Sequence, residues 1–122
     1  MKAMASHLLM GMQAEEQARE HLEQRGLRLL ERNYRCKQGE IDLIMRDGED
    51  LVFVEVRYRK SAAFGSAIES VTANKQNRLL ATARHFLHAN QVSAPCRFDV
   101  VGITGHTPNV QIEWIKDAFR SD

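Results

Sequence analysis

Apolar residues near the start of the chain recur at the spacing of an α-helix. The stripe consists of Leu8, Met12, Ala18 and Leu22. It predicts an amphipathic helix over residues 4–25, and Gly26 stands where a helix commonly ends. At about 100° per residue, Glu15 falls between Leu8 and Leu22 on the helical wheel, so the helix carries one carboxylate toward its buried side.

Three strand patterns follow this helix. Residues 27–35, 39–46 and 51–59 each read as a strand, and Asp47-Gly48 between the last two is a hairpin signal. The last two strands, GEIDLI and LVFVEVR, hold acidic residues at otherwise apolar positions. An ionised and unpaired carboxylate inside such a strand costs several kcal/mol, so each acid needs a partner, a proton or a metal ion.

Side-chain alternation places Asp42 and Glu55 on one face of the predicted hairpin. A two-residue turn at Asp47-Gly48 sets Glu40 opposite Glu55, whereas a four-residue loop over residues 47–50 sets Asp42 opposite Glu55. Both registers keep the two carboxylates together, because only an odd loop length would send them to opposite faces.

A second helix is predicted after a loop at residues 61–65. Thr72 or Ser70 can cap it, and it stops near Asn90. Its apolar stripe is Leu79, Leu80, Ala83, Phe86 and Leu87.

Two further strands are predicted at residues 96–103 and 110–115, with a turn at residues 105–109 between them. The order of helix, three strands, helix and two strands predicts one α/β domain over residues 1–122. Its centre is a mixed five-stranded sheet flanked by helices.

Composition narrows the function classes only slightly. With 122 residues and 43% hydrophobic residues, the chain can build one core without disulfides or structural metals. A net charge of +1 gives no global attraction for nucleic acid, so a polyanion site requires a local cluster of cations. Cys36 and Cys96 lack zinc-site spacing and are expected to be free thiols in the cytoplasm, and no apolar run is long enough to span a membrane.

The acidic positions favour a site for a hard divalent cation. Two carboxylates about 5 Å apart repel by roughly 3 kcal/mol at an effective dielectric constant near 20, which calls for a cation or a shared proton. Glu15, Asp42 and Glu55, with Glu40 nearby, are therefore candidate ligands of Mg²⁺ or Mn²⁺. The alternative is a structural network in which these acids pair with Arg57 or another base.

Basic residues close to these acids are candidate phosphate ligands. Arg57 shares the strand face of Glu55 and can stabilise phosphate charge, although its guanidinium stays protonated and cannot act as a base. Arg59, Lys60 and the basic residues of the neighbouring strand, Arg32, Arg35 and Lys37, extend the surface. Edge-strand charges that prevent aggregation give the same pattern.

Three other groups of polar residues have simpler interpretations. Lys75, Arg78 and Arg84 are typical of a solvated helix face, and His85 and His88 lie opposite the apolar stripe. Asp99 is expected to be structural, anchored by Arg97, with a supporting role beside the site as the alternative.

Several motifs resemble the YraN-like family of predicted nucleases over nearly the whole chain. They are GEIDLI, VFVEVRYRK, SVTANKQNRL and RFDVV. The resemblance implies a restriction-endonuclease-like fold with a PD-(D/E)xK type of active site, distantly similar to archaeal Holliday junction resolvases. It assigns Asp42 and Glu55 as the motif acids and Glu15 as the helix acid.

Two positions depart from the family's pattern. Arg57 replaces the usual lysine, and Ile41 stands where a proline would precede Asp42. Lys75 or Gln76, at the start of the second helix, is expected to supply the missing contact.

The resemblance implies a Mg²⁺-dependent endonuclease acting on DNA, rather than RNA, in branched or single-stranded form. Dimers are expected as well, because a four-way junction presents paired strands. Two alternatives stay open: a catalytically inactive nucleic-acid-binding module of the same fold, and a protein-interaction factor.

Overall fold

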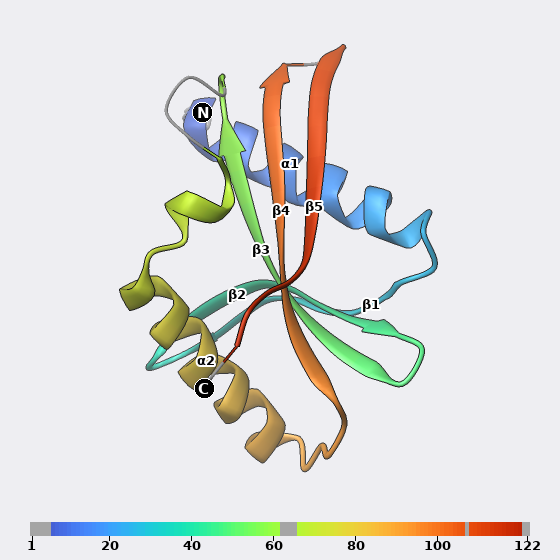
Figure 1. Cartoon of the computed structure of the whole chain (residues 1–122), viewed down its shortest axis with the longest axis vertical. Helices are drawn as coiled ribbons and strands as arrows, with labels where there is room; N and C mark the ends of the chain where they lie inside the picture. Colours follow the sequence, from blue (N-terminus) through green and yellow to red (C-terminus); the bar gives the residue numbers. More distant parts are fainter. Residues whose placement is uncertain (1–5, 62–65, 107, 121–122) are drawn as a thin grey trace, which may run out of the picture.

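The computed structural model describes the backbone of residues 6–61, 66–106 and 108–120, and the side chains within these ranges except those of residues 6–9 and 106. The elements in chain order are α1 (Ser6–Glu23), β1 (Arg28–Cys36), β2 (Gly39–Asp47), β3 (Asp50–Arg59), the 3₁₀ turn η1 (Ile68–Ser70), α2 (Ala73–Ala89), β4 (Cys96–His106) and β5 (Asn109–Phe119). The strands form one sheet in the order β1-β2-β3-β4-β5, in which only β3 and β4 are parallel (Figure 1). The predicted mixed five-stranded α/β fold is confirmed.

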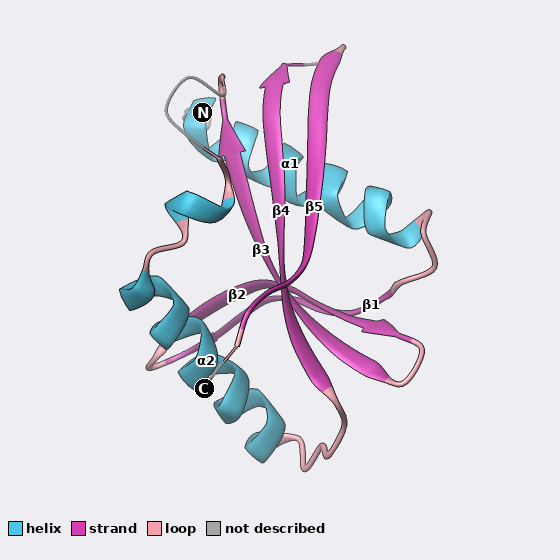
Figure 2. Ribbon diagram, viewed as in Figure 1, coloured by secondary structure: helices cyan, strands magenta, loops and turns pink. Residues whose placement is uncertain are grey.

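The two helices cover opposite faces of the sheet. Alternate residues of β3 point to different sides, so Val52 and Val54 join the core under α1 while Leu51 and Phe53 join the core under α2. Figure 1 shows α1 passing behind β4 and β5, and Figure 2 shows the resulting layers of helix and strand. The sheet is therefore buried on both faces near its centre.

The buried stripe of α1 differs from the predicted one. Ala14, Ala18 and Leu22 are buried, whereas Met12 is 58% exposed. Met12 lies about 120° around the helix from Ala18, because six residues at about 100° each make about 600°, which is about 120° short of two full turns. The side chain of Leu8 lies outside the described residues. With the stripe centred on Ala18, Glu15 sits at its margin and is half-buried.

The hairpin between β2 and β3 has the register of the longer predicted loop. Asp47 pairs with Asp50, so the tight turn is Gly48-Glu49, and the predicted turn at Asp47-Gly48 is wrong by one residue. Gly48 has φ 61°, the left-handed conformation that a two-residue hairpin turn requires and that glycine adopts without a steric penalty. This register determines which residues of β2 and β3 face each other further along the hairpin.

The last hairpin is longer than predicted. Pairing of β4 with β5 continues to His106 and Asn109, so the expected turn at residues 105–109 shrinks to the two residues between them. Pro108 lies in this connection, where its missing backbone N–H costs no ladder hydrogen bond.

The second helix has the predicted cap. Thr72 Oγ1 accepts a hydrogen bond from Lys75 N at 3.2 Å, and the helix ends at Ala89, next to Asn90. The predicted loop at residues 61–65 lies mostly outside the described residues.

Candidate active site

Three polar residues lie in one row across neighbouring strands. The ladder pairs beside the row are Arg32 with Leu43, Tyr34 with Ile41, and Leu43 with Val54. Continuing these registers by one residue brings Asn33 of β1 opposite Asp42 of β2, and Asp42 opposite Glu55 of β3. The two carboxylates that the sequence predicts on one face are therefore direct neighbours in the sheet.

Asp42 occupies the point where the ladder between β2 and β3 ends. Its Oδ2 accepts a hydrogen bond from the backbone N–H of Val56 at 2.8 Å, taking the place of a main-chain carbonyl. Burial, followed by the negative charges of Glu55 and Glu15, raises the pKa of Asp42 to about 8, and only the Val56 hydrogen bond opposes these effects. Such a group is held protonated unless positive charge is brought to it.

Glu55 is the most buried carboxylate of the row, with 5% of its surface exposed. Its Oε2 lies 2.9 Å from Lys75 Nζ in the first turn of α2 and 3.4 Å from an Nη of Arg57. Arg57 also donates from Nε to Ser70 Oγ at 2.9 Å. Glu55 therefore holds two cations in place, and the shorter contact comes from the helix.

Glu15 and Glu40 meet on the other side of Asp42. Asn33 Nδ2 donates to Glu15 Oε1 at 3.1 Å and to Glu40 Oε1 at 3.3 Å. Arg35 Nε donates to the second oxygen of Glu40 at 3.0 Å. The amide of Asn33, on β1, thus links Glu15 of α1 to Glu40 of β2 and brings Glu15 close to the row.

A cavity of about 450 Å³ opens over this row. Its lining residues are Gly39, Glu40, Asp42, Glu55, Val56, Arg57, Thr72, Asn74, Lys75, Arg78 and Leu79. The strands contribute the carboxylates and Arg57, and α2 contributes Lys75 and Arg78. Together these groups suit a divalent cation with a phosphate group.

The carboxylates do not form a closed protein cage for a metal ion. Among the side chains that the structure describes, no three or more of His, Cys, Asp and Glu are arranged to hold one. Mg²⁺ is commonly bound by one or two carboxylates and keeps several waters, so Asp42 and Glu55 are a sufficient protein contribution. Glu15, predicted as a third ligand, is held beside them by Asn33.

Other predicted phosphate ligands lie away from this cavity lining. Arg59 donates from Nη2 to the Ser66 carbonyl at 2.8 Å, Gln76 donates to the Val71 carbonyl at 3.0 Å, and Lys60 is exposed. Arg78, interpreted from sequence as part of a solvated face, does line the cavity. Its position three residues after Lys75, on the same side of the helix, is the feature of the sequence that indicates this placement.

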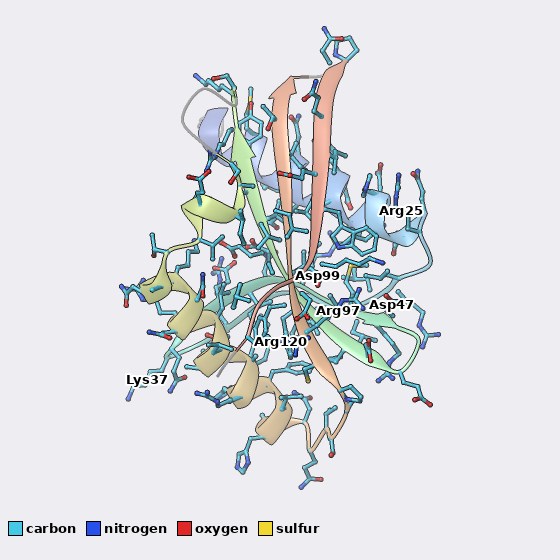
Figure 3. All side chains as sticks on the ribbon, viewed as in Figure 1. Arg25, Lys37, Asp47, Arg97, Asp99 and Arg120 are labelled. Atoms are coloured by element: carbon cyan, nitrogen blue, oxygen red, sulfur yellow. The ribbon has the colours of Figure 1, made fainter. Side chains whose placement is uncertain are left out.

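Asp99 belongs to a separate structural network, as predicted. It is fully buried and accepts hydrogen bonds from Arg97 Nε at 3.1 Å, Trp114 Nε1 at 2.9 Å and the Asp117 backbone at 3.0 Å. Arg97 also reaches Asp47 at 2.9 Å, and Figure 3 shows Asp47, Arg97 and Asp99 gathered together. This network ties the β2–β3 turn to β4 and β5 and is absent from the lining of the candidate site.

The remaining sequence candidates supply no further chemistry to the site. His85 and His88 are exposed, and His85 Nδ1 lies 2.5 Å from the Tyr34 hydroxyl. Both cysteines are free thiols. In the described part of the chain, no helix has the length and apolar character needed to cross a membrane.

A mixed five-stranded sheet, a helix on each face and an acidic row beneath a basic helix end define an α/β protein of nuclease-like architecture. Comparison with known proteins then gives the family. Residues 14–103 match the family described as "Uncharacterised protein family UPF0102", and the chain belongs to that family. This confirms the YraN-like resemblance.

Relatives that carry the family name match almost the full chain. The UPF0102 protein of Saccharophagus degradans is 58% identical over 118 residues, which are 95% of this chain and 97% of the relative. The UPF0102 protein of Nitrosococcus oceani is 54% identical over 118 residues, 95% of each chain.

Proposed function

We propose that this protein is a metal-dependent nuclease that hydrolyses phosphodiester bonds in DNA, with Asp42 and Glu55 as ligands of Mg²⁺ or Mn²⁺. The observation that carries the proposal is the pairing of these two acids on adjacent strands, with the pKa of Asp42 raised to about 8 by burial and by Glu55. A carboxylate that lines a cleft and whose pKa is strongly perturbed by burial and by a charged neighbour is a candidate functional residue. A divalent cation bound there would offset the repulsion between the two carboxylates. Asp42 would then be stable without its proton.

The two cations that contact Glu55 have a complementary task. Lys75 and Arg57 contact Glu55 and line the cavity, so both can donate to the oxygens of a phosphodiester that enters it. In this position they stabilise the negative charge that develops during hydrolysis. The metal ion, when bound, supplies an activated water and neutralises charge on the phosphate.

DNA as the substrate, branched or single-stranded, rests on the family resemblance. The basic side chains at the cavity support a polyanion, because Lys75, Arg57 and Arg78 offer local phosphate donors in a chain whose net charge is only +1. A homodimer, expected from the family resemblance, and a cytoplasmic location, expected from the two cysteines, stay predictions.

The test is a cleavage assay with branched, duplex and single-stranded DNA in the presence of Mg²⁺ or Mn²⁺. Asp42→Asn and Glu55→Gln keep the size of each side chain and remove its charge, so either substitution is expected to abolish cleavage. Glu49→Gln, in the exposed turn of the same hairpin, is the matched control and keeps full activity. Cleavage that survives both site substitutions would refute the proposal.

A second candidate function is nucleic-acid binding without catalysis. It is favoured by one observation: Lys75 and Arg57 already balance the charge of Glu55 when no metal is present. This candidate predicts DNA binding that weakens with salt and is the same in EDTA as in Mg²⁺. Fluorescence anisotropy under the two conditions separates it from the nuclease.

A further inference from the structure

Asn33 has an unusual backbone conformation for a strand residue. Its φ is 53°, and in the described chain it shares positive φ with only two other non-glycine residues, Gln91 and Asp117. Asparagine is among the few side chains that enter this left-handed region readily, because its short amide can hydrogen-bond locally. Strained positions of this kind cluster at functional sites.

Asn33 lies beside the acids of the candidate site. It stands opposite Asp42 in the register of β1 and β2, between the pairs of Arg32 with Leu43 and Tyr34 with Ile41. From there its single amide nitrogen reaches an oxygen of Glu15, on α1, and an oxygen of Glu40, on β2.

The Asn33 amide holds together the carboxylates of Glu15 and Glu40, which would otherwise repel each other. Each of the two Nδ2 hydrogens is donated to a different carboxylate, at 3.1 and 3.3 Å, so both acids are brought close to one atom. Like charges this close repel, and an uncharged donor between them offsets the repulsion without adding a cation. Arg35 donates to the other oxygen of Glu40, whereas the Glu15 carboxylate is held by Asn33.

We propose that Asn33 is a positioning residue that holds Glu15 against Glu40 beside Asp42, and so sets the negative charge density that attracts the divalent cation. This inference rests on the proposed metal site. Residues that orient metal-site groups from outside typically change metal affinity by about tenfold to a hundredfold when replaced.

The experiment measures Mn²⁺ binding to the full chain by calorimetry, without DNA. Asn33→Gly removes the amide and keeps the backbone conformation, since glycine adopts positive φ freely. We expect about tenfold weaker Mn²⁺ binding and an unchanged or raised unfolding temperature. Gln91→Gly is the matched control: it makes the same backbone change at φ 52°, away from the site, and leaves Mn²⁺ affinity unchanged.

A double-mutant cycle with Glu15→Gln tests whether Asn33 acts through Glu15. If it does, Asn33→Gly adds little further loss of Mn²⁺ affinity to Glu15→Gln, because the group that it positions has already lost its charge. Fully additive losses, or an Asn33→Gly protein with unchanged Mn²⁺ affinity, overturn this inference and leave the metal site standing. No Mn²⁺ binding by the unmodified protein overturns the metal site and this inference together.

Discussion

Lys75 Nζ lies 2.9 Å from Glu55 Oε2, so the closest cation to the most buried acid of the site comes from the start of α2 and not from the strand that carries the acid. Arg57, two residues along β3, stays at 3.4 Å and shares its guanidinium with Ser70. The structure thus places a lysine at the site even though the motif position holds arginine.

This contact predicts unequal effects for the two cations on DNA cleavage. Lys75→Met should lower the cleavage rate by about a hundredfold, the usual cost of removing one donor to the transition-state charge. Arg57→Met should cost less, because Ser70 holds part of its guanidinium away from the cavity. Single-turnover rates with saturating DNA check the order, and a larger loss for Arg57→Met would reverse the assignment.

Metal affinity should depend on pH through Asp42. The carboxyl must lose its proton before it can bind a cation, and its pKa is about 8 in the free protein. The apparent Mn²⁺ affinity should therefore rise with pH by up to about tenfold per unit below that value and become constant above it. Calorimetric titrations at several pH values measure this, and an affinity that is flat from acid to neutral pH would contradict it.

Stability of the metal-free protein should change with pH in the opposite direction. Because the folded pKa of Asp42 is raised above its ordinary value of 3.8, the folded chain holds the proton more tightly and is stabilised at low pH. That contribution is lost as pH rises toward about 8, by at most about 1.4 kcal/mol per unit.

The matched comparison is Asp42→Asn, which cannot ionise. Urea unfolding at pH 5 and pH 8 should show Asp42→Asn gaining stability relative to the unmodified protein as pH rises. A stability difference between the two proteins that is the same at both pH values would show that Asp42 ionises normally.

The Asp99 network should affect stability and leave metal binding unchanged. Asp99→Ala leaves Arg97, Trp114 and the Asp117 backbone without their buried acceptor, which should cost about 3–5 kcal/mol of unfolding free energy. Urea unfolding measures the loss, and Mn²⁺ titration of the folded fraction should give the unmodified affinity. A changed Mn²⁺ affinity would connect this network to the site.

Local patterns in the sequence predicted much of the fold. Alternation marked β2 and β3, helical spacing marked α2 together with its Thr72 cap, and the parity of a short hairpin placed Asp42 and Glu55 on one face. The choice between two registers stayed open, because Asp47-Gly48 and Gly48-Glu49 are both acceptable turns by composition. The structure has the second, in which Gly48, with φ 61°, is the first residue of the two-residue turn.

The residues that complete the site come from elements separated in the chain. Asn33 bonds to Glu15 across 18 positions, and Lys75 reaches Glu55 only when α2 has packed on the sheet. Helical periodicity identifies a buried stripe but not how the helix is rotated against the sheet, which is why Met12 was misplaced. The sequence by itself determined the strands and the pair of acids, because alternation and hairpin parity are local. The amide bridge and the lysine contact arose only from tertiary packing, because they depend on how whole elements dock.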